Sequence, residues 1–314
     1  MVLRIFVLLL SLLFSQLTYA NEHGIAVSVD GSPITETDIK ERSKLIIFSS
    51  GLPDSTKSYS LVRDKVIDIL IDENLIEKEA KRLEIELEDD DIKDSFFALA
   101  DRNNIPREHL DDFFRSKKIN EKELRKQLTH QLLWAKIVST KIQPTVNVMD
   151  REIAESRTGI ERAARSASEI SELKLAEIVL FYQKESDVAK NKLFAEKLTT
   201  QIKQGANFGA LAKEFSQSQS ARSYGEIGWV ASNQIQPEIA RKLTRMNIGD
   251  IEIIDLPDGV HIFKLLDKKL ISSVDQTLNE QDIKGLLVEK KLEVAIKSYF
   301  RKLRKNSHIQ FYSK

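Results

Sequence analysis

The stretch "FSQSQSARSYGEIGWV", residues Phe215–Val230, is where the pattern of this 314-residue chain changes from helix to strand. Polar residues follow a helix-like segment, and Gly225, Gly228 and Trp229 then come close together. Glycine permits tight turns and close backbone approach because it has no side chain. The stretch therefore predicts a turn into a strand. It leaves open whether this turn is an ordinary connection or the floor of an active site.

The sequence on both sides of this stretch predicts an α+β module over residues 173–270. The segments "KLAEIVLF" and "GEIGWV" have the apolar content of strands. Helices are predicted after the capping residue Asn207 and from Pro237. Asp258 and Gly259 are typical of a hairpin turn between two further strands. Together these patterns predict a four-stranded antiparallel sheet with roughly three helices.

Upstream of this module, residues 21–156 predict a mainly helical domain. Apolar residues recur at steps of three and four in "LVRDKVIDILIDENLIEKEAKRL" and "EKELRKQLTHQLLWAKIVSTKI", which is the spacing of one helix face. Further helices are predicted from Asp89 to Asn103 and around Arg107 to Ser116. Since each apolar face must be covered, we expect these helices to pack on one another.

The two ends of the mature chain both carry a strand pattern. Ile25, Val27 and Val29 alternate with small residues, and Ile309 and Phe311 alternate with polar ones. A lone terminal strand needs a partner. We therefore expect the two ends to pair, so that the C-terminal helix and strand complete the helical domain and the α+β module is an insert.

A polar and charged run, "RTGIERAARSASEISE", is typical of a linker between the two parts. The expected organisation is as follows: 1–20 signal peptide, 21–156 helical domain, 157–172 linker, 173–270 α+β module, and 271–314 C-terminal helix and strand.

The first residues predict export. Arg4 precedes the apolar run Ile5–Phe14, and Thr18 and Ala20 are the small residues expected before a cleavage site. The run is shorter than the ~20 residues of a membrane span. We expect cleavage near Ala20 and no stable span afterwards, with an uncleaved anchor as the alternative.

Composition argues against several classes of protein. Lys plus Arg and Asp plus Glu both total 48, so the formal net charge is zero, whereas nucleic-acid-binding proteins carry a concentrated basic excess. No glycine-rich phosphate loop is present, so a nucleotide is not an expected partner. The chain has no cysteine, and its histidines lack metal-ligand spacing. No metal or cofactor is therefore expected.

Several segments carry a family resemblance. Outside the central module these are "AVSVDGSPITETDIKER", "SSGLP", "LIDENLIEKEAKRLEIELEDDDI", "LTHQLLWAKIV" and "YFRKLRKNSHIQF". Together they resemble the chaperone domain of the SurA family of periplasmic chaperones. Inside the module, "AEIVL", "FSQSQSARSYGEIGW" and "GDIEIIDLPDGVHIFKLLDKK" resemble a parvulin, which is a peptidyl-prolyl isomerase domain. The resemblance implies one parvulin-type domain in an α+β chain, where some members have two.

The resemblance also implies where the polar floor of a parvulin site would lie. That floor has two histidines, a cysteine or aspartate, and a serine or threonine. Here Glu177 stands at the first histidine position, His261 keeps the second, and Ser218 stands at the cysteine or aspartate position. These three residues are the candidate catalytic residues.

Three further residues are candidates for substrate binding by the same resemblance. Trp229 follows the second glycine of the signature, and Asp258 occupies the last turn. Glu238 stands just after Pro237, where an aromatic residue usually grips the proline ring. In addition, Tyr224 replaces the first of a usual glycine pair.

These departures predict altered chemistry. A Glu177–His261 pair favours a protonated histidine, because a nearby negative charge stabilises the cation. Glu238 would place a charge where an apolar contact is needed, unless it turns outward. Both changes predict weak or absent isomerase activity. As alternatives, His261 is a satisfied core histidine, and Trp229 and Phe263 are core residues.

Two functions of different class follow. The first is an ATP-independent holding chaperone of the periplasm that binds unfolded outer-membrane or other exported proteins. The second is an active prolyl isomerase that assists the folding of exported proteins, with the helical part delivering the substrate. The residues Glu177, Ser218, Glu238 and His261 favour the first.

Overall fold

The structure is a computed structural model that describes residues 24–102, 104–117, 119–165, 169–183, 185–272 and 279–312. The predicted signal peptide lies outside these residues. Within the described ranges, no helix has the length and apolar character needed to cross a bilayer.

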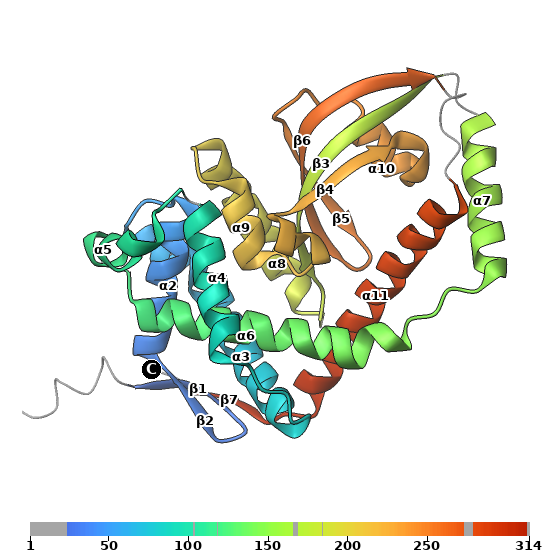
Figure 1. Cartoon of the computed structure of the whole chain (residues 1–314). Helices are drawn as coiled ribbons and strands as arrows, with labels where there is room; N and C mark the ends of the chain where they lie inside the picture. Colours follow the sequence, from blue (N-terminus) through green and yellow to red (C-terminus); the bar gives the residue numbers. More distant parts are fainter. Residues whose placement is uncertain are drawn as a thin grey trace, which may run out of the picture. The chain divides into compact units, whose positions relative to one another are not determined.

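Figure 1 labels the helices and strands of the described residues. The helices are α2 (Glu36–Ser50), α3 (Thr56–Arg82), α4 (Asp89–Arg102), α5 (Leu110–Ser116), α6 (Glu121–Ile137), α7 (Asp150–Arg165), α8 (Asp187–Lys203), α9 (Phe208–Phe215), α10 (Pro237–Leu243) and α11 (Glu280–Lys305). The strands are β1 (Ile25–Val29), β2 (Ser32–Thr35), β3 (Glu169–Phe181), β4 (Glu226–Ala231), β5 (Ile251–Leu256), β6 (Gly259–Ser272) and β7 (Ile309–Phe311).

The chain forms two compact units. The first takes its described residues from the ranges 1–45, 62–133 and 304–314, and the second from 46–61 and 134–303. The second unit thus includes 46–61 and 134–156, from the range predicted as the helical domain, together with most of α11. Trp134, for example, meets the ring of Phe300 edge-on, with centroids 5.1 Å apart.

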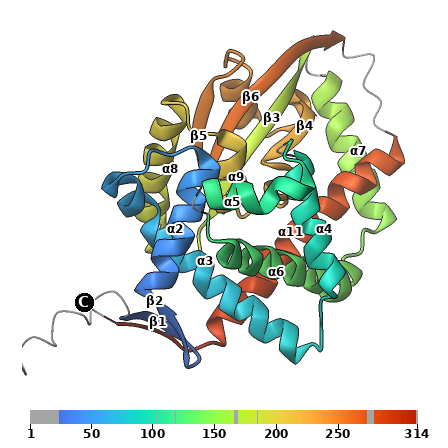
Figure 2. The same ribbon diagram turned by 60° about the vertical axis from the view of Figure 1, so that its left-hand side comes forward.

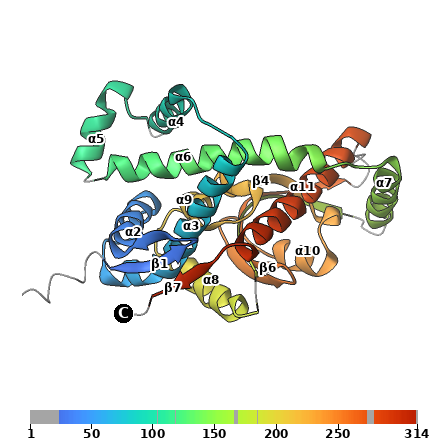
Figure 3. The ribbon, with the colours of Figure 1, turned by 90° about the horizontal axis from the view of Figure 1, so that it is seen from below.

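In the first unit, a small sheet joins the two chain ends. Its strand order is β2-β1-β7, and Val27 lies opposite Phe311 in the antiparallel β1–β7 pair. Figure 3 shows β7 beside β1. The predicted pairing of the two ends is therefore confirmed. At the following helix, the Thr35 hydroxyl accepts from the Asp38 backbone N–H, and Asp38 accepts from the Thr35 N–H, which is a reciprocal helix cap.

The helices of this unit bury both an apolar cluster and a charge network. The cluster joins α2, α4, α5 and α6 through Leu45, Phe96, Ala100, Leu110, Phe114, Leu124 and Leu128. Beside it, the fully buried Arg42 of α2 donates to Glu73 of α3 at 2.6 Å and to Glu123 of α6 at 2.9 Å. The guanidinium thus links three helices, and its positive charge lies beside the carboxylates of Glu73 and Glu123.

In the second unit, the predicted four-stranded antiparallel sheet is confirmed. Its strand order is β4-β3-β6-β5, and β3 pairs with β6 from Glu169 to Phe181. Helices α8 and α9 lie on one face of the sheet and α10 on the other (Figure 1). An apolar cluster on the α10 face contains Leu175, Leu243, Ile254 and Phe263. The α+β class that the sequence predicts is the observed one.

The predicted linker is not a structureless connection over its length. Helix α7 continues to Arg165, and β3 begins at Glu169. The helix has a reason to form: Ile153 packs in a small cluster with Val148 and with Ile283 of α11. Figure 2 shows α7 and α11 side by side. Alanine, glutamate and arginine, which dominate the end of α7, are strong helix formers.

Removal of the buried Arg42 charge should destabilise the first unit strongly. In the Arg42→Met variant, Glu73 and Glu123 lose their buried cation, which typically costs about 3–5 kcal/mol. Chemical unfolding should therefore begin at a clearly lower denaturant concentration. The matched control is Arg115→Met, because Arg115 is exposed beside Asp112 and such pairs contribute little. Equal unfolding curves for the two variants would contradict a structural role for the buried network.

Candidate functional site

The sheet brings two of the predicted catalytic residues to one face. Glu177 lies on β3 opposite Phe263, and His261 lies on β6 opposite Val179. Directly paired residues share a face, and so do residues two positions apart on one strand. The side chains of Glu177 and His261 therefore project from the same face, which is also the face that α10 covers.

The segment from Phe215 to Val230 positions Ser218 over this face by hydrogen bonding to β3. The backbone N–H of Glu177 donates to the carbonyl of Gly225 at 2.8 Å. Further along, the N–H of Val179 donates to the Ser216 hydroxyl at 3.0 Å, and that of Phe181 donates to the side chain of Gln217 at 2.7 Å. The segment thus follows the edge of β3 as an irregular partner, and its residues are fixed beside Glu177.

Gly225 is the closest point of that approach. Its φ is +82°, and a Cβ built there would lie 2.5 Å from the carbonyl oxygen of Glu177 and 2.7 Å from the Cβ of Ala212. Only glycine fits such a position. The preceding Tyr224 also has a left-handed backbone, with φ +57°, which a glycine would adopt more easily. The predicted turn therefore exists, and its glycine holds β3 and the site segment together.

The Glu177 carboxylate is the centre of the polar contacts. One of its oxygens accepts hydrogen bonds from Ser218 Oγ at 2.6 Å and from Ser220 Oγ at 3.0 Å. Its other oxygen lies 3.7 Å from His261 Nδ1. Ser218 is therefore in direct contact with a carboxylate, with no imidazole between them, which is not the arrangement of a serine nucleophile with its histidine base.

His261 lies between two carboxylates. Its Nε2 is 3.3 Å from Oδ1 of Asp258, in addition to the Glu177 contact on the other side of the ring. Burial by itself lowers the pKa of His261, but the hydrogen bond to Asp258 and the charge of Glu177 outweigh it and raise the pKa to about 9. The same hydrogen bond lowers the pKa of Asp258. His261 is thus a cation at neutral pH.

The structure does not bring the other two predicted binding residues into this group. Trp229 is 43% exposed on β4, and its ring lies under the Lys269 ammonium, which is 4.5 Å from the ring centroid. The alternative that Trp229 is a core residue is therefore wrong. Glu238 is exposed in the first turn of α10. The next residue, Ile239, packs against the apolar cluster that contains Phe263.

Sequence reasoning missed residues from two places. Ser220 shares the Glu177 oxygen with Ser218, and the repeated serines of "SQSQS" are a signal that could have indicated it. Glu293 and Lys297 come from α11, where no local pattern marks them. Burial raises the pKa of Glu293, as do the charges of Glu177 and Asp258. Helix α11 therefore contributes charges to the group around His261.

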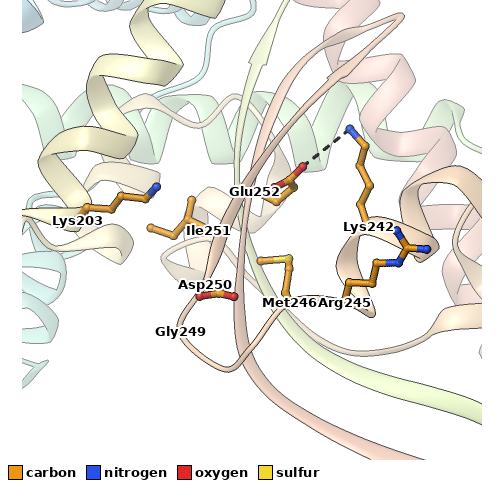
Figure 4. Close-up of a pocket in the computed structure, with 8 residues that line it drawn as sticks. All are labelled: Lys203, Lys242, Arg245, Met246, Gly249, Asp250, Ile251 and Glu252. Atoms are coloured by element: carbon orange, nitrogen blue, oxygen red, sulfur yellow. Dashed lines mark ion pairs between the residues drawn. The ribbon is translucent and has the colours of Figure 1, made fainter.

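A separate hollow lies away from these residues. It measures about 460 Å³ and is lined by Lys203, Lys242, Arg245, Met246, Gly249, Asp250, Ile251 and Glu252. Figure 4 shows these residues, with Lys242 and Glu252 paired at 3.8 Å. The mixed charges of its wall give no single ligand chemistry. None of the six predicted site residues lines it, so the polar group around His261 is the better candidate site.

No group of three or more metal-ligating side chains occurs within the described residues. The carboxylates near His261 instead have protein partners: two serines for Glu177, and His261 and Lys297 for Asp258. The arrangement is therefore a network of hydrogen bonds and ion pairs. Chemically, it can hold a polar ligand group next to the apolar wall that Phe263 and Ile239 form.

The profiles of two protein families match different parts of the chain. The family profile of the SurA-like N-terminal domain matches residues 1–138, and that of the PPIC-type PPIASE domain matches residues 159–269. The chain is 27% identical over 255 residues to the chaperone SurA of Pectobacterium atrosepticum. It is 24% identical over 244 residues to the chaperone SurA of Pseudomonas syringae pv. tomato. These matches cover 77% and 76% of this chain but only 57% and 55% of the two relatives.

Solved structures include matches of two kinds. A PpiC-type peptidyl-prolyl cis-trans isomerase domain is 30% identical and covers 32% of this chain and 92% of its own, with a TM-score of 0.30. A SurA-like chaperone structure of Campylobacter jejuni is 15% identical and covers 93% of this chain and all of its own, with a TM-score of 0.42.

Two glycines of the signature should respond differently to substitution. Gly225→Ala combines a left-handed backbone with the close contacts to Glu177 and Ala212, so we expect a loss of about 3 kcal/mol or more. Gly228→Ala has φ +91° but open space around it, so only the backbone term of about 1–2 kcal/mol applies. Thermal or urea unfolding of both variants measures the difference. Equal losses would contradict the close approach at Gly225.

His261 should make stability depend on pH. Its pKa in the folded protein is above the ordinary 6.5, so its stabilising effect is complete below pH 6.5 and is lost as the pH rises through about 9. The difference between these values corresponds to on the order of 3 kcal/mol. Urea unfolding at a series of pH values should show this decline in the wild type and not in His261→Gln.

The matched control for the pH series is His109→Gln, because His109 is exposed. This variant should keep the decline between pH 6.5 and 9. If His261→Gln kept it as well, the pairing of His261 with Glu177 and Asp258 would not be its source.

Proposed function

We propose that this SurA-like chain with one PPIC-type domain is an ATP-independent periplasmic chaperone that holds unfolded outer-membrane or other exported proteins. The observation that supports this proposal most is the pair of family matches, which together cover most of the chain. Within the isomerase-type domain, Glu177 replaces the first histidine of the family site and contacts Ser218 and His261. The periplasmic location rests on the signal-like first residues and on the kinship with SurA. The absence of a phosphate-binding loop agrees with independence of ATP.

The chemistry of the site supports weak isomerase activity. Rotation about an Xaa–Pro bond has a barrier of about 18–20 kcal/mol, and an isomerase must stabilise the twisted amide. A neutral histidine could accept or donate a hydrogen bond near that amide. His261 is instead a cation between Glu177 and Asp258, and the Ser218 hydroxyl donates its hydrogen bond to Glu177. These side chains would have to leave strong charged partners to act on a substrate.

The second unit also offers a surface suited to extended clients. Within the described part of the chain, β4 lies at the edge of its sheet and pairs with β3 alone. Ile227 and Trp229 are two positions apart on β4, and both are more than a third exposed. An edge strand with apolar side chains can take up an unfolded segment by main-chain pairing and apolar contact. Such binding is reversible and needs no nucleotide.

The alternative function is an active isomerase that assists the folding of exported proteins. The retained His261 and the apolar wall with Ile239 and Phe263 favour it, since a proline ring needs an apolar contact. This function requires that His261 can act on a substrate amide while the carboxylates of Glu177 and Asp258 lie beside it.

One experiment separates the two functions. A chemically denatured outer-membrane β-barrel protein is diluted into buffer with the full chain and without ATP, and light scattering follows aggregation. In parallel, a protease-coupled assay measures turnover of an Xaa–Pro peptide. We expect suppression of aggregation near equimolar chaperone, together with peptide turnover close to the uncatalysed rate.

Two variants test whether His261 is needed for either activity. His261→Ala should leave suppression of aggregation unchanged, and His109→Ala serves as an exposed control. Strong peptide turnover that His261→Ala abolishes would favour the isomerase instead. A chain that fails to suppress aggregation would refute the proposed holding activity.

A further inference from the structure

Lys297 of α11 reaches the turn that carries Asp258. Its ammonium donates to the backbone carbonyl of Asp258 at 3.1 Å and lies 3.7 Å from Oδ2 of the same residue. It also lies 3.8 Å from the centre of the Phe181 ring. A carbonyl, a carboxylate and an aromatic face therefore surround one ammonium group.

This set of partners is typical of a site built for a cation. Carbonyl and carboxylate oxygens accept the hydrogens of an ammonium or guanidinium, and the face of an aromatic ring attracts positive charge. The Lys297 side chain is only 19% exposed, which is low for a lysine. Burial lowers the pKa of Lys297, while the charge of Asp258 opposes that change. Lys297 is thus enclosed in contacts rather than extended into solvent.

The charge balance around Asp258 favours a cation even without Lys297. Glu177 and Asp258 share the positive charge of His261, so these three side chains keep a net negative charge when Lys297 is withdrawn. Around them, the charge of Glu293 favours a cation at the position of Lys297 and that of Arg301 opposes one. The two serines that bond Glu177 carry no charge. The Asp258 side chain is 44% exposed, so a group from outside can reach it.

We propose that Phe181 and Asp258 form a subsite for a lysine or arginine side chain of an extended client segment, and that Lys297 occupies this subsite until a client displaces it. The inference deepens the proposed function, because it rests on the binding of unfolded clients. It names a chemical preference: among apolar segments, those with a basic residue bind this domain better.

The test uses the full chain and two fluorescein-labelled decapeptides. They are identical except that one has a lysine before a central proline and the other has norleucine, which keeps most of the stem and loses the charge. Fluorescence anisotropy measures both dissociation constants for the wild type and for Lys297→Met, Lys302→Met, Asp258→Asn and the double variant Asp258→Asn with Lys297→Met. Methionine removes the ammonium that lies over the Phe181 ring and beside Asp258.

The expected result is a charge preference that appears when the in-chain lysine is removed. Lys297→Met should bind the lysine peptide about fivefold more tightly than the norleucine peptide. The wild type should show a smaller preference, because Lys297 competes. Lys302→Met should match the wild type, since Lys302 is an exposed residue of the same helix. The double variant should bind both peptides equally.

Two outcomes would overturn the subsite: no lysine preference in Lys297→Met, or a preference that persists in the double variant. Should the Asp258 variants fail to fold, as judged by near-ultraviolet circular dichroism, salt dependence replaces them. The lysine preference of Lys297→Met must then fall as sodium chloride is added, and a salt-independent preference overturns the proposal.

Aggregation assays on the same proteins distinguish failure of the subsite from failure of the proposed function. Holding activity without a lysine preference refutes the subsite alone. A lysine preference without holding activity refutes the chaperone proposal alone.

Discussion

The contacts made by β3 are the constraint on which the second unit depends. One edge of this strand pairs with β6 along its whole length, and the other bonds to β4 and to the irregular segment between Ser216 and Gly225. Backbone groups buried in a sheet must find partners. The segment supplies them with a hydroxyl, a side-chain amide and a glycine carbonyl. A side chain at Gly225 would force the segment away from Glu177, and Ser218 and Ser220 would then lose their position.

The same close packing explains the charges of the site. Once β3 and the segment are fixed, Glu177 lies beside two hydroxyls and an imidazole in a largely buried place. A buried carboxylate needs hydrogen bonds and a counter-charge, and Ser218, Ser220 and His261 provide them. The result is a stable cation at His261. Because Glu177 and Asp258 raise the pKa of His261 to about 9, the network favours the protonated imidazole over the neutral one at pH 7.

Much of the fold could be predicted from the sequence because its signals are local. Alternating apolar residues marked β1 and β7, and Asn207 and Pro237 marked the starts of α9 and α10. Helix α7 continues to Arg165, into the range predicted as a linker, and its contact through Ile153 with Ile283 joins residues too far apart in sequence for a local pattern to reveal. The site shows the same limit. The resemblance indicated Glu177, Ser218 and His261, but Glu238 was placed in a binding role while Ile239, one position on, faces the apolar cluster.

Helix α11 is where the sequence carried the least information and the tertiary structure adds the most. Its apolar stripe predicts only a packed helix, and Lys297 is one of many lysines along it. Lys297 differs from the other lysines in its contacts, which are made with Asp258 and Phe181. These two residues come together only because the β5–β6 turn closes over the end of β3. Tyr182 fixes this closure through its N–H, which donates to the Asp258 carbonyl at 2.9 Å. That carbonyl also accepts from Lys297, so the bond that closes the sheet also orients the cation-binding turn. A helix outside the isomerase-type domain thereby becomes part of the chemistry of its site.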